Sequence, residues 1–385
     1  MNGPLTEASG PVAIDLASLR GGSPGIRRLI VAMLDRWLLL SRSNLEIKSN
    51  WLCYGASRDC EDAEDPQLLF ARRRYSLFPG IISRAASPLI ESPYWLFRDR
   101  PTSYWGPAHR LPAIKPHRTR CVVTIHDVCW KRYPETMHPL SYLADAAFMP
   151  SAIKRADVVV AVSHATAEDI AHFWPSAISR IRVIPLGVDH DWFDISNTDN
   201  QSDPFSEFGR YFLSVGTIEP RKNIVRVLKA YASLAVRDPS CPSLVIVGKM
   251  GWGSDSPLVL ARSLGVAHRV VWLRSASDDQ LKHLYRQAVA LVFPSLYEGF
   301  GLPALEAMAA GTPVITSNRA SLPEVVGNAA LLVDPLRVDD IREAMRALAS
   351  DDALRAGLIE RGIERAGQFS WENTSSRMLD VFSGR

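Results

Sequence analysis

Around residue 300 the chain reads Pro294-Ser-Leu-Tyr-Glu-Gly-Phe-Gly-Leu-Pro-Ala-Leu-Glu306, a glycine-rich turn that leads into a helix. The apolar run Ala288–Phe293 before it predicts a buried parallel strand. Pro303 can stand in the first turn of the helix, because the N–H that it lacks would have no partner there. Such a unit directs backbone N–H groups and the positive end of a helix dipole at one point, which suits an anion such as a diphosphate.

Two carboxylates flank this turn. Glu298 precedes it, and Glu306 is expected in the first turn of the helix. Because carboxylates repel phosphate, they should face the neutral, hydroxyl-rich parts of a ligand. A phosphate cradle with a carboxylate on each side favours a nucleotide sugar.

Two other interpretations of this stretch compete. Gly299–Ala304 fits the dinucleotide fingerprint G-x-G-x-x-A, which requires an acidic residue at the tip of the next strand. The next expected strand, Thr312–Thr316, is followed by Ser317 and Asn318 instead, and Glu324 lies too far along. A strand, turn and helix with a tight glycine corner and no ligand is the plainer alternative.

The spacing E-x7-E of Glu298 and Glu306 lies in a longer phrase that resembles glycosyltransferase family 4, the retaining enzymes of the GT-B fold. The continuation as far as Ile315, and then Leu322–Val326, is similar to that family as well. The resemblance covers nearly the whole chain and is sharpest over Tyr211–Asp334. It implies an α/β protein of two Rossmann-like, doubly wound parallel-sheet domains that face an interdomain cleft.

The length of 385 residues also suggests two domains, and 47% hydrophobic with 22% charged residues is a globular composition. We expect an acceptor-side domain at residues 1–195, a linker at 196–208 and a nucleotide-sugar-binding domain at 209–368. By the resemblance, a helix at 369–385 crosses back to the first domain, and Trp371 anchors it.

Composition excludes some classes of protein. With 44 basic against 41 acidic residues, the net charge of +3 gives no argument for nucleic acid as a partner. The five cysteines form no C-x-x-C pair, which is typical of a reducing cytoplasm. The first residues do not resemble a secretory signal, and the most apolar segment, Leu29–Leu40, is too short to span a bilayer. We therefore expect a cytoplasmic location.

Basic residues gather in one part of the chain. Residues 70–120 hold ten Lys or Arg against Glu91 and Asp99, and Ala71–Pro79 mixes basic with aromatic side chains. A solvated helix face with a few core aromatics is the plainer interpretation. The alternative is a surface that contacts anionic lipid headgroups or a lipid diphosphate acceptor, peripheral at the inner face of the plasma membrane.

Several candidate site residues are expected in the first domain. A glycine loop with Gly22 and Gly25 follows an apolar strand and precedes a helix, and the resemblance places it near the donor phosphates; a simple turn is the alternative. His126 follows an apolar run and precedes Asp127. A histidine there can donate a hydrogen bond or exchange a proton near neutral pH. The family's histidine faces the donor sugar, and a segment similar to its acceptor side contains His109.

In the second domain, Gly216 ends a strand, and Arg221 and Lys222 follow it in the same loop. A departing diphosphate needs positive charge, which a chain without a metal site must supply from side chains. An Arg-Lys pair alone is usually solvated, but this phrase resembles the family's diphosphate clamp. It departs from the commoner family pattern at Thr217, where that pattern has Arg.

The resemblance implies a role for each remaining candidate. Glu306 would bind the ribose hydroxyls, and Glu298 the hydroxyls of the transferred sugar. Arg274, in a loop that lies against the nucleobase in the family, is a further candidate. The turn residues expected to bind the donor are Gly299, Phe300, Gly301 and Leu302. Asp189-His-Asp191 spells a D-x-D metal motif, which we reject because a hard-cation site gathers more oxygen ligands; neither metal nor cofactor is expected.

The phrases Val215–Asn223 and Thr124–Asp127 look like those of bacterial mannosyl- and rhamnosyltransferases of surface polysaccharide assembly. The sequence thus predicts a retaining hexosyltransferase that uses a nucleotide sugar, GDP-mannose above others. Its acceptor would be a lipid-linked or oligosaccharide hydroxyl in lipopolysaccharide, O-antigen or exopolysaccharide synthesis. Two alternatives stay open: a rhamnosyl- or glucosyltransferase of the same fold, and a catalytically silent GT-B subunit that binds a nucleotide sugar.

Overall fold

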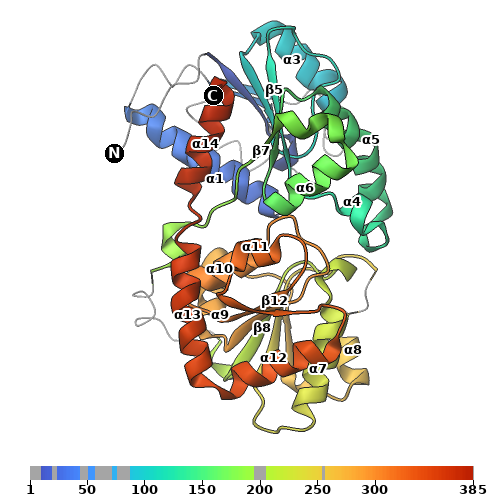
Figure 1. The fold of residues 1–385 in the computed structure, drawn as a ribbon, viewed down its shortest axis with the longest axis vertical. Coiled ribbons are helices and arrows are strands. Elements are labelled where there is room, and N and C mark those ends of the chain that lie inside the picture. Colours follow the sequence, from blue (N-terminus) through green and yellow to red (C-terminus); the bar gives the residue numbers. More distant parts are fainter. Residues whose placement is uncertain are drawn as a thin grey trace. The chain divides into compact units, whose positions relative to one another are not determined.

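The computed structural model of the protein describes residues 10–19, 24–43, 51–56, 72–75, 87–194, 205–253 and 256–384. The chain forms two compact units (Figure 1). Unit 1 consists of Met1–Val128, Leu143–Gly187 and Trp371–Arg385, and unit 2 of Cys129–Tyr142 and Val188–Ser370.

Unit 1 contains, within the described ranges, a seven-stranded parallel sheet in the order β3-β2-β1-β4-β5-β6-β7. Most of its inner strands are runs of buried apolar residues, as expected for a parallel sheet with helices on both faces. The strands are β1 (Val12–Asp15), β2 (Trp51–Ala56), β3 (Arg72–Tyr75), β4 (Ser103–Gly106), β5 (Arg120–Ile125), β6 (Val158–Ala161) and β7 (Ile181–Val183). The helices of this half are α1 (Pro24–Ser43), η5 (Ser87–Glu91), α3 (Ser92–Asp99), α5 (Pro139–Arg155) and α6 (His164–Phe173).

Unit 2 repeats the same strand order in a six-stranded parallel sheet of its described residues, β10-β9-β8-β11-β12-β13. Its strands are β8 (Tyr211–Val215), β9 (Ser243–Val247), β10 (Val270–Leu273), β11 (Ala290–Phe293), β12 (Val314–Ser317) and β13 (Ala330–Val333). Its helices are α4 (Cys129–Arg132), α7 (Ile224–Ala235), α8 (Pro257–Ser263), α9 (Asp278–Gln287), α10 (Leu302–Ala309), α11 (Leu322–Val326), α12 (Val338–Ser350) and α13 (Asp352–Ala366).

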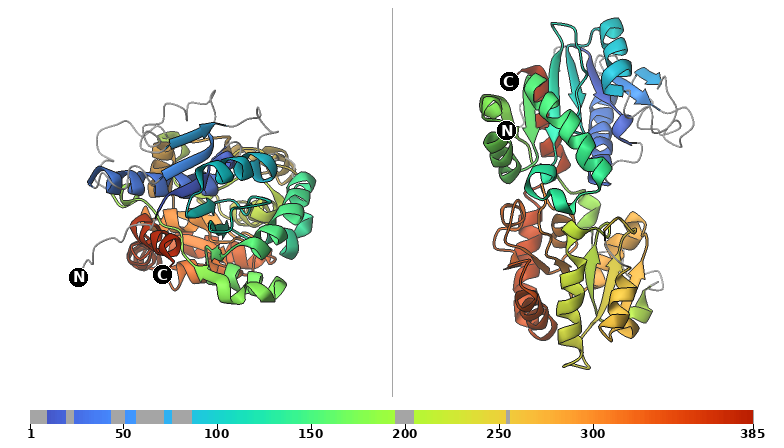
Figure 2. Two further views of the ribbon diagram at one scale, coloured as in Figure 1. Left: turned by 90° about the horizontal axis from the view of Figure 1, so that it is seen from above. Right: turned by 90° about the vertical axis from the view of Figure 1, so that its right-hand side faces the viewer.

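Helices lie on both faces of each sheet (Figure 2). The prediction of two Rossmann-like, doubly wound parallel sheets is therefore confirmed. In each sheet the strand order reverses next to the first strand, between β1 and β4 and between β8 and β11. Ligands of such sheets bind beyond the carboxyl ends of the strands at this reversal.

The last helix, α14 (Trp371–Ser383), belongs to unit 1 and packs against α1. Trp371 is buried, and the Phe382 ring lies against the rings of Trp37 and Trp105, at 5.8 and 6.3 Å. Arg36 of α1 also forms a salt bridge of 3.0 Å with Glu372 of α14.

The division of the chain differs from the predicted boundary at residue 195. The Val188 N–H donates to the Phe369 carbonyl at 3.1 Å, and Val188 pairs with Ser370, so the chain already belongs to unit 2 from this point. Residues 129–142, which the sequence assigns to the first domain, also group with unit 2.

Some predictions fall outside the described residues: Gly22, most of the linker at 196–208 and, within the basic segment 70–120, residues 70–71 and 76–86. In the part of the chain that is described, no helix has both the length and the apolar character needed to cross a bilayer.

Candidate active site

Two loops meet where the strand order of unit 2 reverses. One follows β8 and contains Gly216, whose φ of +139° is left-handed backbone. The other follows β11, and its Leu296 N–H donates to the carbonyl of Arg221 in the first loop at 2.9 Å. This bond holds together two segments that the sequence separates by 75 residues, at the sheet edge where ligands bind.

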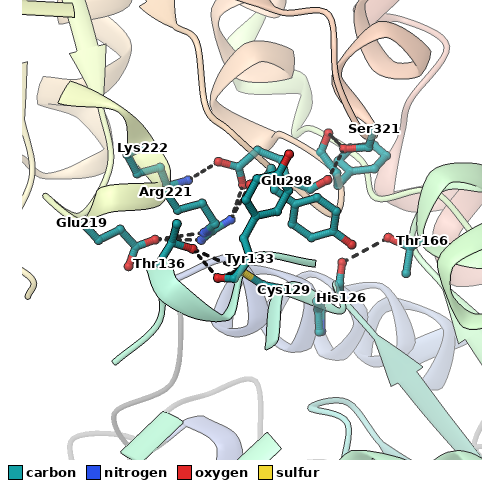
Figure 3. A network of polar contacts seen from close by, with 12 residues as sticks. His126, Cys129, Tyr133, Thr136, Thr166, Glu219, Arg221, Lys222, Glu298 and Ser321 are labelled. Carbon is teal, nitrogen blue, oxygen red and sulfur yellow. Dashed lines mark hydrogen bonds and ion pairs between the residues drawn. The ribbon is translucent and has the colours of Figure 1, made fainter. Parts of the chain in front are cut away.

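An ion cluster joins these loops (Figure 3). The buried carboxylate of Glu298 accepts from Lys222 Nζ at 2.6 Å and from Arg221 at 2.9 Å. Arg221 is held further by Glu219, at 2.8 and 3.2 Å, and by the Tyr297 carbonyl at 3.1 Å. The structure thus brings together the cations and one of the two carboxylates that the sequence selects.

Charge at Glu298 is set by these neighbours. Burial alone raises the pKa of its carboxyl group, but the positive charges of Arg221 and Lys222 and the hydrogen bond from Lys222 outweigh burial and hold the pKa below its ordinary value. Glu298 is therefore a carboxylate at neutral pH, an acceptor for N–H and hydroxyl groups and not a proton donor.

The glycine turn has a fixed shape. Gly301 has a φ of +106° and directly precedes α10, and a Cβ atom at this position would lie 2.6 Å from the Leu322 side chain. The buried hydroxyl of Ser321 shares its proton between the carbonyls of Glu298 and Phe300, at 2.8 and 2.9 Å. Pro303 stands at the start of the helix as expected.

Glu306 lies in the second turn of α10 and not in the first, because the helix begins at Leu302. Its carboxylate is buried and accepts from the Tyr285 hydroxyl at 3.2 Å. Tyr285, on α9, is itself fixed because its carbonyl accepts from Thr312 and its ring packs edge-on against Trp192. One side of the Glu306 carboxylate is therefore oriented by the protein.

In unit 1, His126 follows β5 at the carboxyl edge of the sheet. Its Nε2 carries the proton, since it donates to the Pro107 carbonyl at 2.8 Å. Burial, followed by the nearby His109, lowers the pKa of the imidazole to about 4. Of the two roles that the sequence allows for His126, the structure shows hydrogen-bond donation, and the lowered pKa disfavours proton exchange near neutral pH. The other ring nitrogen, Nδ1, is an acceptor.

His109 lies on the loop after β4, 6.2 Å from the His126 ring, with its Nε2 3.5 Å from Asp145. Its φ of +44° is unusual for a residue other than glycine and marks a tight loop. In unit 2, exposed Arg274 follows β10 and stacks on Trp272 at 5.0 Å. His109 and Arg274 thus each lie at the carboxyl edge of their own sheet. Asp191 of the rejected D-x-D motif forms an ion pair with Lys282.

The described residues contain no group of three or more His, Cys, Asp or Glu arranged to hold a metal ion.

Comparison with known proteins identifies the family. The family model "Glycosyl transferases group 1" matches residues 196–365, and "Glycosyltransferase Family 4" matches residues 50–192. O-antigen chain mannosyltransferase B of Escherichia coli is 35% identical over 300 residues, which cover 75% of this chain and 76% of the relative. The chain belongs to the GT-B glycosyltransferases.

Two more known proteins are similar to this chain, one in sequence and one in structure. The serotype-specific mannosyltransferase WbdA of Escherichia coli is 30% identical over 280 residues, 70% of this chain but only 34% of WbdA. HepE of Anabaena, solved in complex with UDP and glucose, superposes with a TM-score of 0.73 at 16% identity over 98% of this chain and 100% of HepE. At that identity the likeness shows the fold alone.

The sequence did not point to three residues that contact this candidate site. Each of them contacts a predicted residue or the predicted turn: Glu219, Tyr285 and Ser321. Only Glu219 lies in a phrase quoted for the resemblance. For Glu219 the signal was present, because an acid two residues before Arg221 can pair with it. Tyr285 and Ser321 had no such local signal.

Proposed function

We propose that this glycosyltransferase moves a hexose, mannose from GDP-mannose, to a hydroxyl of a lipid-linked or oligosaccharide acceptor, with retention of anomeric configuration. Membership of the family and the likeness to O-antigen mannosyltransferase B support a role in surface polysaccharide synthesis. We propose that it works on the cytoplasmic side of the membrane, in peripheral contact with it.

The observation that carries this proposal is the Lys222–Glu298–Arg221 cluster beside the glycine turn. Glu219 and Glu298 balance the charges of Arg221 and Lys222, and this cluster places the N–H donors of both cations where α10 begins with the positive end of its dipole. A nucleoside diphosphate needs such a field as its bond to the sugar breaks. Lys222 supplies it most directly, because Arg221 is already held by Glu219.

In the proposed complex, Glu306 binds the ribose hydroxyls, and Glu298 binds hydroxyls of the hexose next to the N–H groups of Phe300 and Gly301. Gly25, which the structure places in the first turn of α1 and not in the expected loop, approaches the phosphates together with Gly22, and Arg274 approaches the base. His126 orients the sugar through Nδ1, which accepts a hydrogen bond from a sugar hydroxyl. No side chain of the protein is assigned as the base. The departing phosphate therefore takes the proton of the acceptor hydroxyl, on the same face of the sugar.

Transfer assays test this proposal. The purified protein is given a lipid-linked oligosaccharide acceptor with GDP-mannose, UDP-glucose or TDP-rhamnose, and sugar transfer and the anomeric configuration of the product are measured. We expect GDP-mannose to be preferred. Lys222→Ala should lower kcat by about 10²–10³-fold, the usual effect of removing one group that stabilises developing charge. Lys229→Ala, an exposed lysine on α7, is the matched control and should retain activity.

Other outcomes would change the assignment. A preference for UDP-glucose or TDP-rhamnose would replace the donor and keep the reaction. Donors that raise the melting temperature without any transfer would favour the silent nucleotide-sugar-binding subunit. Full activity of Lys222→Ala would remove this cluster from the mechanism.

A further inference from the structure

One asparagine of unit 2 connects three loops at the carboxyl edge of the sheet. Asn223 directly follows Lys222 and stands before α7. It is 3% exposed, and its φ of +63° is left-handed backbone. Its amide nitrogen donates to the carbonyl of Pro294 at 3.0 Å and to that of Pro335 at 2.7 Å. These carbonyls belong to the loops after β11 and β13, so the side chain bridges both loops to its own, which follows β8.

The orientation of the Asn223 amide follows from its partners. Carbonyl oxygens can only accept, so the nitrogen must face Pro294 and Pro335. The amide oxygen faces Arg226 at 2.9 Å, and a guanidinium can only donate. Both N–H bonds of the amide are therefore used, and its oxygen has a donor as well. Removing the amide would take a donor from two carbonyls in the same step.

Few residue types meet the requirements at position 223. Left-handed backbone is adopted readily by glycine and, among residues with a side chain, chiefly by asparagine and aspartate. Of these three, only asparagine has two N–H bonds that can reach two carbonyls. Glycine would keep the backbone and lose the bridge, and aspartate would place carboxylate oxygens against carbonyl oxygens. The bridge, and not the backbone alone, therefore specifies the residue.

Two of the three bridged loops carry the ion cluster. Lys222 precedes Asn223 in the loop after β8, and the loop after β11 continues from Pro294 to Glu298. The Glu298 carboxylate accepts from Lys222 at 2.6 Å, as Figure 3 shows. Because Asn223 and Pro294 lie close to these ionic groups in sequence, the bond between them fixes how near the two loops come. The length of the Lys222–Glu298 contact depends on that approach.

The third loop provides a firm anchor for the bridge. Asp334, which lies next to Pro335, accepts from the Leu336 N–H at 3.0 Å. It also accepts from Arg319 of the loop after β12 at 3.0 Å. The Pro335 carbonyl is thus held by a loop that has its own internal bonds. An amide attached to such a loop cannot shift without breaking several contacts at once.

We propose that Asn223 is a positioning residue of the donor site, whose amide holds the loops after β8 and β11 at the separation at which Lys222 meets Glu298. Asn223 does not contact the substrate, because it is buried and its amide is bonded within unit 2. The chemistry that this placement serves rests on the proposed function. The placement of Lys222 itself does not, so the two can be tested apart.

Chemical labelling tests the placement without any reaction of the enzyme. The protein is treated with a limiting amount of N-hydroxysulfosuccinimidyl acetate, and mass spectrometry compares acetylation of Lys222 with that of exposed Lys229. Lys222 should react more slowly in the parent protein, because its Nζ is ion-paired and its side chain is 13% exposed. Asn223→Asp should raise the ratio of the two rates about fivefold, which corresponds to about 1 kcal/mol, the typical contribution of one hydrogen bond. Asn328→Asp makes the same exchange at an exposed position of unit 2 and should leave the ratio unchanged.

A double-mutant cycle tests the effect on sugar transfer. Asn223→Asp should lower kcat by about 10²-fold, a loss that displacement of a reacting group by about 1 Å can cause. In the Lys222→Ala background the same exchange should lower kcat much less, because the group that it displaces is already absent. Asn223→Gly keeps the left-handed backbone, should change labelling and kcat in the same direction, and decides the test if Asn223→Asp does not fold. All measurements are made at a temperature at which circular dichroism shows each variant folded.

The outcomes separate this inference from the proposed function. An unchanged labelling ratio in both Asn223 variants overturns the inference, whatever happens to kcat. An equal loss of kcat with and without Lys222 also overturns it, because Asn223 would then act by another route. If the parent transfers no sugar from any donor while Asn223→Asp raises the labelling ratio, the positioning role of Asn223 stands and the proposed function fails.

Discussion

At the scale of single residues, Glu298 compensates the charges of Arg221 and Lys222 and is also the proposed ligand of the sugar hydroxyls. A substitution that deletes its carboxylate would remove both roles at once. A buried carboxylate is stable here because Arg221 and Lys222 compensate the loss of water. Removing it would take the carboxylate partner from Lys222 while Arg221 keeps Glu219, at a cost of about 3–5 kcal/mol in the free energy of unfolding. Lys222 is the cleaner position to change, because Glu298 keeps Arg221 as a partner when Lys222 is absent.

Tyr285 offers a test of how Glu306 is oriented. Tyr285→Phe removes the hydroxyl that donates to Glu306 and keeps the ring that packs against Trp192. Such a hydrogen bond contributes about 0.5–1.5 kcal/mol, so KM for the nucleotide sugar should rise by about 2–13-fold, with kcat little changed. Steady-state kinetics with varied donor measure both constants.

The control for this change is Tyr231→Phe. Tyr231 is a buried tyrosine of the same unit, and its hydroxyl donates to the Arg269 carbonyl at 3.3 Å, away from the two loops of the site. It should lower stability to a similar degree and leave KM unchanged. An equal rise of KM in both variants would mean that Tyr285 acts through stability and not through Glu306.

The sequence could identify the candidate side chains of the site but not the groups that hold them in place. Glu298, Glu306, Arg221 and Lys222 lie in recognisable phrases. Tyr285 reaches Glu306 from another helix, and this contact depends on how α9 and α10 pack. The lowered pKa of His126 likewise follows from burial, which the local phrase does not contain.

At the scale of elements, apolar runs located the strands well but extended them too far. Residues 288–293 form one apolar run, yet the strand begins at Ala290, because its ladder with β8 begins there. Helix α3 shows a deeper limit. Its sequence mixes serines with large apolar residues, and contacts with other elements, such as the hydrogen bond from Tyr104 of β4 to Ser92, decide which face is buried.

The turn before α10 can be tested at Gly301. Gly301→Ala forces a side chain into backbone with φ of +106° and brings its Cβ to 2.6 Å from Leu322. We expect a loss of about 1–3 kcal/mol in the free energy of unfolding and weaker donor binding, because the turn also carries Glu298. Urea denaturation and donor titration measure the two effects.

Gly357→Ala provides the comparison for this substitution. Gly357 lies inside α13 with no positive φ, and its nearest neighbour would be the flexible end of Arg361 at 3.3 Å. Alanine should stabilise this helix by up to about 1 kcal/mol and leave donor binding unchanged. If Gly301→Ala were equally harmless, the turn would be less constrained than its geometry indicates.

At the scale of the whole molecule, unit 1 is completed by the last residues of the chain. Residues 188–370 form most of unit 2, and α14 then supplies Trp371, Met378 and Phe382 to the core of unit 1. The first unit therefore cannot finish its core until the second has been synthesised. Its stability depends on a segment that is more than 240 residues away in sequence from β5.

Phe382→Ala tests this dependence. The ring lies against Trp37 and Trp105, so its removal leaves a cavity and should cost about 3–5 kcal/mol in unit 1. Hydrogen exchange followed by mass spectrometry should show faster exchange in β1, β4 and β5, with unchanged protection in β8 and β11. Leu336→Ala, at an exposed position of unit 2, should alter neither sheet. Equal loss of protection in both sheets of Phe382→Ala would mean that the two units unfold as one cooperative body, because a cavity in unit 1 would then destabilise unit 2 as well.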